Sequence, residues 1–399
     1  MSERDFAREV VRQLQEAGHE ALFAGGCVRD ELLGLVPKDY DIATAALPEE
    51  VRSLFPRSLS VGQAFGVVEV LGPKPLRVQV ATFRRDGTYS DGRHPDQVVF
   101  SSAHEDALRR DFTINGMFYD PLRDKVIDFV GGRDDLQRRI LRAIGDPYQR
   151  FAEDRLRLLR AVRLAARFEC TIEPATWQAI RQRAATLGQG VSAERIQDEL
   201  RKMVADPHRI RAFRLLQESG LAAVILPEWN GATLPLLERL AQPSFSLALA
   251  ALLHPLGAAV ARRIAQRLRL SNEERERLEW LVTHADTLQV ADKLRNAHLK
   301  ILMNHPGAEE LLEFTRAQGF VRQAQFAQAQ RSVWQREGSL NPPPLLTGKD
   351  LLALGLQSGP LFKQLLSEIR EAQLEGEIHT REEALARVQE RLRLSSPEQ

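Results

Sequence analysis

The chain has 399 residues, of which 43% are hydrophobic and 27% charged, and its formal net charge is +1. This length exceeds what one compact core accommodates, so we expect two to four domains of ordinary globular composition. The only cysteines, Cys27 and Cys170, are too few for a disulfide framework or a cysteine-rich zinc site. The polar N-terminus shows no secretory signal, and the longest apolar run, 247–261, is too short to span a bilayer. A cytoplasmic location is therefore expected.

The first 130 residues predict a mixed α/β domain. An amphipathic helix around Phe6–Leu14 comes first, and its apolar residues recur at helical spacing. Strands are expected at 21–24, 39–44, 66–71, 76–83, 97–101, 117–119 and 125–129. From Gly131 onward the pattern is helical, with a helix start at Asp146-Pro147, so the fold class is α+β.

Two short motifs between residues 22 and 41 carry most of the chemical information. Gly25 and Gly26 allow a tight turn that brings bare backbone N–H groups against a phosphate. Asp39 and Asp41 stand at i and i+2, so on an extended strand both carboxylates point to one face and suit Mg²⁺. Each motif alone is typical of a turn or a solvated strand end. Their combination in one unit favours a site for nucleotidyl transfer.

The charge is unevenly distributed along the chain. Residues 1–132 carry an acidic excess, whereas 133–214 carry a basic excess. A basic block suits a phosphate backbone, but arginine-rich surface helices are also common, and charge alone does not separate the two interpretations.

Four further segments show a resemblance to a known family: 82–95, 109–117, 153–160 and 192–200. In this order and spacing they resemble the class II nucleotidyltransferases, which are the CCA-adding tRNA nucleotidyltransferases and the related bacterial poly(A) polymerases. The resemblance is specific up to about residue 215 and weaker beyond. It implies a mixed-sheet head followed by an all-α neck, body and tail. The expected ranges are 1–130 for the head, 131–215 for the neck, 216–335 for a body like a degenerate HD domain, and 336–399 for the tail.

The resemblance also implies roles for individual residues. Asp39 and Asp41 would bind the metal ions that activate an RNA 3′-hydroxyl and stabilise the leaving pyrophosphate. The implied nucleotide-binding residues are Gly25, Gly26, Arg29, Arg110, Asp111, Asn115, Asp154, Arg157 and Arg160. The glycines and Arg29 would hold the triphosphate, and Arg110, Asp111 and Asn115 would contact triphosphate and ribose.

Asp154 and Arg157 would recognise the base. Spaced three apart on one helix, they would be neighbours, with the carboxylate accepting from an exocyclic amino group and the guanidinium donating to a ring acceptor. Cytosine and adenine offer that pair of groups, whereas uracil and guanine place a carbonyl opposite the carboxylate. An ordinary ion pair is the simpler interpretation of these two residues taken alone. Arg157, Arg160, Arg163 and Arg167 fall on one face of the expected helix and form a basic stripe, which a solvated face explains equally well.

Two positions depart from the family pattern. Gln79 stands where relatives often carry an acidic residue beside the metal site, and Glu69 is a candidate substitute. Pro255 follows His254 where the phosphohydrolase-like domain of many relatives has His-Asp, so we expect a packed His254 and an inactive helical body.

The expected function is addition of C and A to the 3′ end of tRNA, with CTP and ATP as substrates, Mg²⁺ as cofactor and the acceptor arm on the basic helical surface. An enzyme that adds only A, or a poly(A) polymerase, would use the same residues. The loop at 84–95, with Asp86, Tyr89, Asp91 and Arg93, argues mildly against an enzyme that acts only after CC. A second alternative is an inactive RNA-binding relative, favoured by Gln79 and Pro255.

Overall fold

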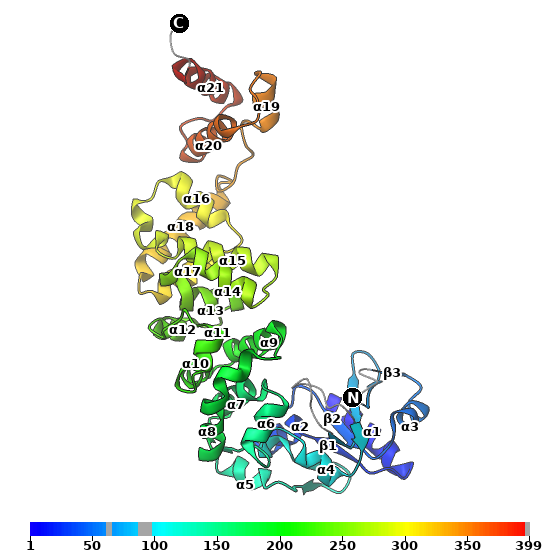
Figure 1. Ribbon diagram of the computed structural model, residues 1–399. Coiled ribbons are helices and arrows are strands. Elements are labelled where there is room, and N and C mark those ends of the chain that lie inside the picture. The colour runs from blue at the N-terminus through cyan, green and yellow to red at the C-terminus, as the bar shows by residue number, and fades with distance from the viewer. Residues whose placement is uncertain (61–65, 87–97, 396–399) are drawn as a thin grey trace. The chain divides into compact units, whose positions relative to one another are not determined.

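The computed structural model describes residues 1–60, 66–86 and 98–395 (Figure 1). The chain divides into two compact units, Met1–Trp229 and Asn230–Gln399. Unit 1 contains every residue that the sequence indicates for catalysis or nucleotide binding. Its strands are blue to cyan in Figure 1, and its later helices are green.

Unit 1 begins with a seven-stranded sheet in the order β3-β4-β5-β2-β1-β8-β9. The strands are β1 Ala21–Ala24, β2 Asp41–Thr44, β3 Ser58–Ser60, β4 Val67–Leu71, β5 Arg77–Thr82, β8 Phe118–Asp120 and β9 Lys125–Ile127. β2 and β5 pair in parallel, and the other neighbours in this sheet are antiparallel. A mixed sheet followed by a long run of helices confirms the α+β class.

The sheet is held by helices on its apolar surface. The early helices of unit 1 are α1 Glu3–Glu16, α2 Gly26–Leu32, α3 Pro48–Leu54 and α4 Ala103–Leu108. α1 buries Phe6, Val10 and Leu14, as its spacing predicts. α4 packs on the face that carries Leu22 and Phe118. The glycine turn follows the end of β1, and Asp41 is the first residue of β2.

The strands expected from the sequence are present, with shifts of one or two residues at their ends. The 39–44 strand begins only at Asp41, so Asp39 precedes it. Strands β3 and β6 Arg84–Asp86 were not expected; β6 pairs with β7 Val98–Phe100, the strand expected at 97–101. Residues 87–97, which include Tyr89, Asp91 and Arg93, lie outside the described residues.

The second half of unit 1 is mainly helical. Its helices are α5 Gly132–Gln137, α6 Pro147–Glu153, α7 Arg157–Arg167, α8 Pro174–Arg183, α9 Ala193–Ala205, α10 Arg209–Glu218 and α11 Leu221–Ile225. A two-residue parallel pair, β10 Ile140–Leu141 with β11 Thr171–Ile172, interrupts the helical pattern. The boundary expected at 215 falls inside α10, whereas the compact unit ends at Trp229. All of the domain limits expected from the sequence stay predictions.

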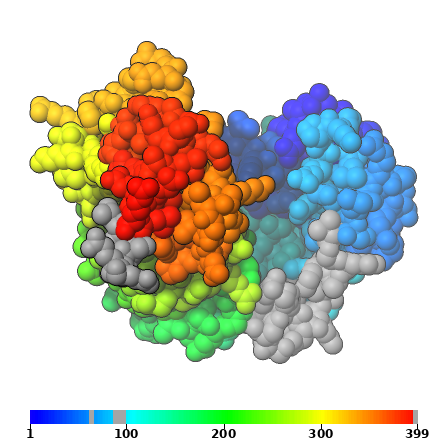
Figure 2. Space-filling model, turned by 90° about the horizontal axis from the view of Figure 1, so that it is seen from above, coloured from blue at the N-terminus to red at the C-terminus, as the bar shows by residue number. Residues whose placement is uncertain are grey.

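Unit 2 is helical throughout the part that the structure describes. Its α-helices are α12 Leu234–Arg239, α13 Phe245–Leu253, α14 Ala258–Arg267, α15 Asn272–His284, α16 Asn296–Asn304, α17 Ala308–Ala317, α18 Val321–Arg336, α19 Gly348–Ala353, α20 Pro360–Glu375 and α21 Arg381–Ser395. Every residue of α13 is buried. The last three helices share a small core around Leu351, Leu365 and Val388 and form the orange and red surface of Figure 2. None of the helices described is long and apolar enough to cross a membrane.

Candidate active site

A cavity of about 470 Å³ in unit 1 gathers the residues that the sequence indicates for nucleotide binding. The complete expected set lines it: Gly25, Gly26, Arg29, Arg110, Asp111, Asn115, Asp154, Arg157 and Arg160. Asp41 lines the same cavity, and Asp39 lines a second cavity next to it, which Asp41 also borders. The structure thus brings the two motifs and the neck arginines together. Their individual roles stay predictions.

The turn between β1 and α2 requires glycine at its first position. Gly25 has φ +76°, and a Cβ there would come within 2.8 Å of Nη1 of Arg110. The Gly25 N–H donates to the carbonyl of Met117 at 3.1 Å, which ties the turn to the segment before β8. Backbone and guanidinium can therefore approach each other at the cavity wall only because no side chain separates them.

The carboxylates lie at the start of β2, beside β5. The register pairs Asp41 with Gln79 across β2 and β5, and pairs Gln79 with Glu69 across β5 and β4. Gln79 therefore occupies the position next to Asp41. Glu69 lies one strand farther away, at about 10 Å from Asp41 if strands are about 4.8 Å apart. Among the described residues, no group of three acidic side chains that could hold a metal ion includes Glu69, and its part as a substitute stays a prediction.

The donor set fits a hard divalent cation. Asp41 is exposed at the cavity wall, but the surrounding protein shields its carboxyl partly from water and raises its pKa. The charge of Arg110 opposes this rise in pKa, and the charge of Asp39 adds to it. Two carboxylates brought together in this way offer the oxygen ligands that Mg²⁺ takes when phosphate oxygens and water complete its shell. Within the described residues, no group of three or more His, Cys, Asp or Glu side chains could hold a metal ion, so substrate oxygens would have to supply further ligands.

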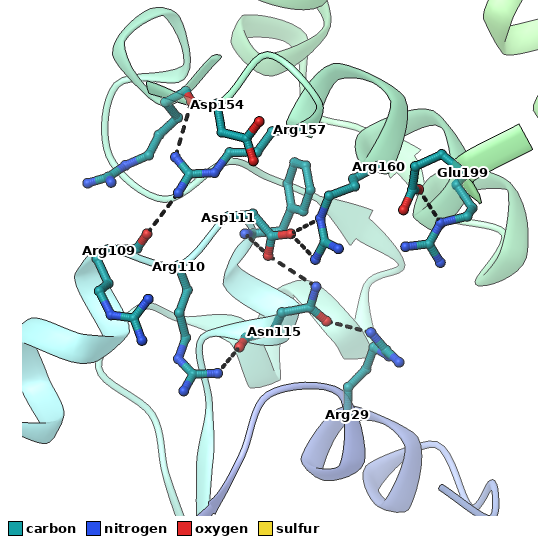
Figure 3. A network of polar contacts seen from close by, with 12 residues as sticks. Arg29, Arg109, Arg110, Asp111, Asn115, Asp154, Arg157, Arg160 and Glu199 are labelled. Carbon is teal, nitrogen blue, oxygen red and sulfur yellow. Dashed lines mark hydrogen bonds and ion pairs between the residues drawn. The ribbon is translucent and has the colours of Figure 1, made fainter. Parts of the chain in front are cut away.

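A chain of hydrogen bonds runs from the head to the neck across the cavity (Figure 3). Arg29 donates to the side-chain oxygen of Asn115, and Asn115 donates through Nδ2 to Oδ1 of Asp111 at 3.2 Å. Oδ2 of Asp111 accepts from Nε and Nη2 of Arg160 at 2.8 and 2.6 Å. Arg29 is itself buried and paired with Asp30. These contacts fix α2, the 3-10 turn Thr113–Asn115 and α7 relative to one another.

Asp111 stays ionised in this network. Burial alone would raise the pKa of its carboxyl, but the charge and hydrogen bonds of Arg160, with the bond from Asn115, lower it to about 2. Both oxygens are occupied, since Oδ1 also accepts from the backbone N–H of Phe112 at 2.8 Å. In this arrangement Asp111 orients its neighbours.

Asp154 and Arg157 do not share a helix, which corrects the sequence-based expectation. α6 ends at Glu153, Asp154 has an extended backbone, and α7 begins at Arg157. The reason is local: Oδ1 of Asp154 accepts from the backbone N–H of Leu156 at 3.0 Å, a side-chain bond that competes with helix continuation. The break turns Asp154 toward the cavity beside Arg157 (Figure 3).

The two side chains are held by different partners rather than by each other. Oδ2 of Asp154 accepts from Nη2 of Arg195 on α9 at 2.8 Å. Arg157 donates to Glu153 at 2.7 Å and to the backbone carbonyl of Arg109 at 3.2 Å. A simple ion pair between Asp154 and Arg157 is therefore not what this structure contains. Each group is positioned independently at the cavity wall.

Sequence reasoning did not select Arg109, Arg163 and Arg195, which also line the cavity. Arg163 is 11% exposed and donates to Glu199 at 2.6 Å. The basic stripe on α7 offered a signal for Arg163, and the 192–200 motif contained Arg195. Their partners lie 36 and 41 residues away in sequence, and only the fold reveals those contacts.

His254 in unit 2 lies at the end of α13 with its ring edge-on to Phe314, at 5.4 Å between ring centroids. Its Nδ1 is 3.4 Å from the carbonyl of Ala251. The histidine is thus packed, as expected. A lost hydrolase site in this unit stays a prediction.

Comparisons with known proteins agree with this site. Residues 21–142 match the family model described as the poly A polymerase head domain, and 170–232 match the probable RNA and SrmB-binding site of polymerase A. A CCA-adding enzyme from Lactobacillus johnsonii is 34% identical over 395 residues, which cover 95% of each chain. The chain belongs to the CCA-adding enzyme and poly(A) polymerase family.

Other members of this family match more closely over part of their length. The CCA-adding enzyme of Geobacillus stearothermophilus is 43% identical over 217 residues, and this match spans 54% of the present chain and 53% of that enzyme, about half of each. The crystal structure of Bacillus stearothermophilus CCA-adding enzyme in complex with CTP superposes with a TM-score of 0.82 at 31% identity and covers 98% of this chain and 99% of that one. As is general for nucleotidyltransferases of this family, a divalent metal is expected at the carboxylates.

Proposed function

We propose that the protein adds C and A to the 3′ end of tRNA without a nucleic-acid template, using CTP and ATP and releasing pyrophosphate. The observation that carries the proposal is the shared cavity, where Asp41 lies with a glycine turn, a cluster of arginines and the Asp154–Arg157 pair. The solved relative with CTP gives this combination its substrate class.

Asp39 and Asp41 would hold Mg²⁺. The ion would lower the pKa of the attacking 3′-hydroxyl and neutralise negative charge on the leaving pyrophosphate. Arg29 and Arg110 would bind the triphosphate beside the Gly25-Gly26 turn. Because Gln79 cannot ionise, it would neither add charge to the metal site nor act as a base, and the reaction would rely on the two aspartates.

The base would be selected by side chains alone. The Asp154 carboxylate would accept from the exocyclic amino group of cytosine or adenine, and Arg157 would donate to the adjacent ring acceptor. Uracil or guanine would set a carbonyl against the carboxylate and leave buried polar groups unpaired. Such a mismatch typically costs about 1–3 kcal/mol per base contact.

Two alternatives use the same chemistry. Addition of A only, or poly(A) synthesis, would need the same carboxylates and the same base-facing pair, and the matched poly A polymerase head domain is compatible with it. The 84–95 loop that would help to separate these activities lies largely outside the described residues.

The cytoplasm is the location we propose for such an enzyme, as the compartment in which tRNA is processed.

The test uses purified protein, Mg²⁺ and three tRNA substrates that end before CCA, after C and after CC. Each nucleoside triphosphate is supplied singly and together, a generic RNA is the control, and the 3′ ends are sequenced. We expect ordered addition of C, C and A, then a halt. Addition of A to the CC-ending substrate, with no addition to the other substrates, would identify an A-adding enzyme. Long A tracts on generic RNA would identify a poly(A) polymerase. Tight tRNA binding without incorporation would overturn the enzyme assignment.

A further inference from the structure

The Arg29 guanidinium on α2 lies on the face of an aromatic ring from the end of α7. Arg29 is 6% exposed, and its guanidinium carbon is 4.1 Å from the centre of the Phe168 ring. An aromatic face carries negative charge density that attracts a cation, and the attraction is strongest where water is excluded. Phe168 is itself 4% exposed, so this contact is made under such conditions.

The electrostatic surroundings of Arg29 give the ring a part to play. Burial lowers the pKa of Arg29 and is opposed mainly by the charge and hydrogen bonds of Asp30, with a smaller effect of Asp111. The charge of Arg167 lowers this pKa too, and the Arg167 guanidinium carbon lies 5.2 Å from the centre of the same ring. A buried cation beside a second cation needs compensation from all of its neighbours. The face of Phe168 supplies one such contribution to Arg29.

The way in which α7 ends fixes the position of the ring. Phe168 is the C-cap of this helix, and the N–H of Cys170 donates to the carbonyl of Ala165 at 2.9 Å. Glu169, between them, has the left-handed backbone that such a helix ending requires, with φ +52°. The carbonyl of Phe168 accepts from Nη1 of Arg139 at 2.8 Å. The backbone on both sides of the ring is therefore held.

The supported guanidinium also faces the glycine turn. Arg29 lines the first cavity, and a Cβ on Gly26 would lie 3.5 Å from its Nη2. Nε and Nη2 donate to Asp30 at 2.9 and 2.7 Å, and Nη1 donates to Asn115 (Figure 3). A guanidinium has five N–H groups, and these bonds use three of them. The other two can bind phosphate oxygens at the turn as long as the guanidinium plane keeps its orientation.

We propose that Phe168 is a positioning residue for the nucleotide triphosphate, because its ring holds the Arg29 guanidinium in the plane from which it binds phosphate oxygens. Phe168 does not line the first cavity, where the nucleotide is placed, and acts through Arg29. This inference rests on the proposed function and adds to it a residue at the end of α7 that no part of the expected nucleotide-binding set includes.

The test changes the Phe168 ring in two ways. F168L keeps an apolar side chain and removes the aromatic face. Incorporation of a ring-trifluorinated phenylalanine at position 168 keeps the shape of the ring and withdraws negative charge from its face. The matched controls are the same two changes at Phe213 on α10, which is 1% exposed, lines neither cavity, and packs edge-on against Trp229.

The Kd values of CTP and of CMP are measured with Mg²⁺ by equilibrium dialysis. We expect F168L to weaken CTP binding by roughly tenfold and the fluorinated ring to weaken it by about threefold, the range that a shielded cation–π contact provides. CMP lacks the outer phosphates, so its Kd should change by less than about twofold in both proteins. The two changes at Phe213 should leave both Kd values at those of the wild type.

Three outcomes would overturn the proposal. Equal losses for CTP and CMP would mean that Phe168 only maintains the shape of the cavity. A fluorinated ring that binds CTP as the wild type does would mean that the aromatic face does not act on Arg29. Losses of CTP binding of the same size at Phe213 would mean that any change in this core has the effect. If F168L does not fold, the fluorinated protein decides, because its packing is nearly that of the wild type.

The proposed function and the role of Phe168 fail in different ways. A wild type that incorporates no nucleotide contradicts the function, and Phe168 is then judged from the Kd values alone. A wild type that is active, with CTP binding unchanged by both substitutions at Phe168, contradicts the positioning role only.

Discussion

Asp154 is held at two points, since Oδ1 accepts from the Leu156 N–H and Oδ2 from Arg195. A carboxylate fixed in this way presents acceptors only, and this is the property that would favour an amino group on the incoming base. Under the proposed function, Arg195 would act on the base through Asp154, as a positioning residue. Base selection would therefore depend on the orientation of one carboxylate rather than on the shape of the cavity alone.

Substituting Asp154→Asn tests this role. The amide can donate to a carbonyl, so we expect the ratio of kcat/KM for CTP to that for UTP to fall by about tenfold or more, which corresponds to one base contact of about 1–3 kcal/mol. The control is Asp134→Asn, at an exposed side chain on α5. The same CTP-to-UTP ratio in D154N and the wild type would exclude Asp154 from base selection.

Substituting Gly25→Ala tests whether the tight turn beside Arg110 matters for CTP. Alanine there would adopt a left-handed backbone, at about 1–2 kcal/mol, and would crowd Arg110. Gly18→Ala is the matched control, because Gly18 has φ +89° with no atom within 4 Å of a Cβ. We expect both variants to lower the free energy of unfolding and only G25A to lower kcat/KM for CTP. Equal kinetics in the two variants would show that the contact with Arg110 is irrelevant.

Among the elements of unit 1, α7 is joined by the Asp111–Arg160 pair to the segment just before the 3-10 turn Thr113–Asn115. The folded state lowers the pKa of Asp111 to about 2, below the usual value of about 3.9 for an unfolded aspartate. The contribution to stability is therefore present above about pH 4 and is lost as the pH falls toward 2. It amounts to about 2–3 kcal/mol.

Asp111→Asn should remove this pH dependence. We expect the difference in free energy of unfolding between the wild type and D111N to shrink by roughly 1–2 kcal/mol between pH 5 and pH 2.5. Urea unfolding followed by the emission of Trp177 and Trp229 measures it for unit 1, in a background with Trp280 and Trp334 replaced by Phe. A difference that stays constant over this range would contradict the account.

Individual elements also show what sequence alone reveals. The apolar spacing of α1 and the runs of β1, β4 and β5 were readable because the burial of each follows its own local pattern. The break between α6 and α7 could not be predicted, because the residues around Asp154 keep helical spacing. Only the hydrogen bond from the Leu156 N–H to the Asp154 side chain interrupts the helix. The place of Gln79 beside Asp41 was expected from the motif, but the distance to Glu69 depends on strand order, which one sequence does not specify.

At the scale of the whole molecule, every described residue that lines the two cavities belongs to unit 1. The helices of unit 2 have cores of their own, including the separate cluster of α19 to α21. Nucleotide binding and stability of unit 2 should therefore be separable properties.

Hydrogen exchange on the full chain tests this separation. With CTP and Mg²⁺, we expect added protection of backbone amides in α2, the 113–115 turn and α7, and none in residues 230–395. CTP without Mg²⁺ and the metal alone serve as controls. Protection by CTP that extends over α13 to α18 would mean that the nucleotide site is not confined to unit 1.

The central claim is that the carboxylates at the start of β2 catalyse nucleotide addition in the cavity where CTP binds. The most direct measurement is single-turnover incorporation of CMP into tRNA lacking CCA by the wild type and by Asp41→Asn, with the Kd of CTP measured in parallel. We predict incorporation by the wild type, and in D41N a loss of at least about a hundredfold with CTP still bound. Incorporation by D41N at the wild-type rate would contradict the account.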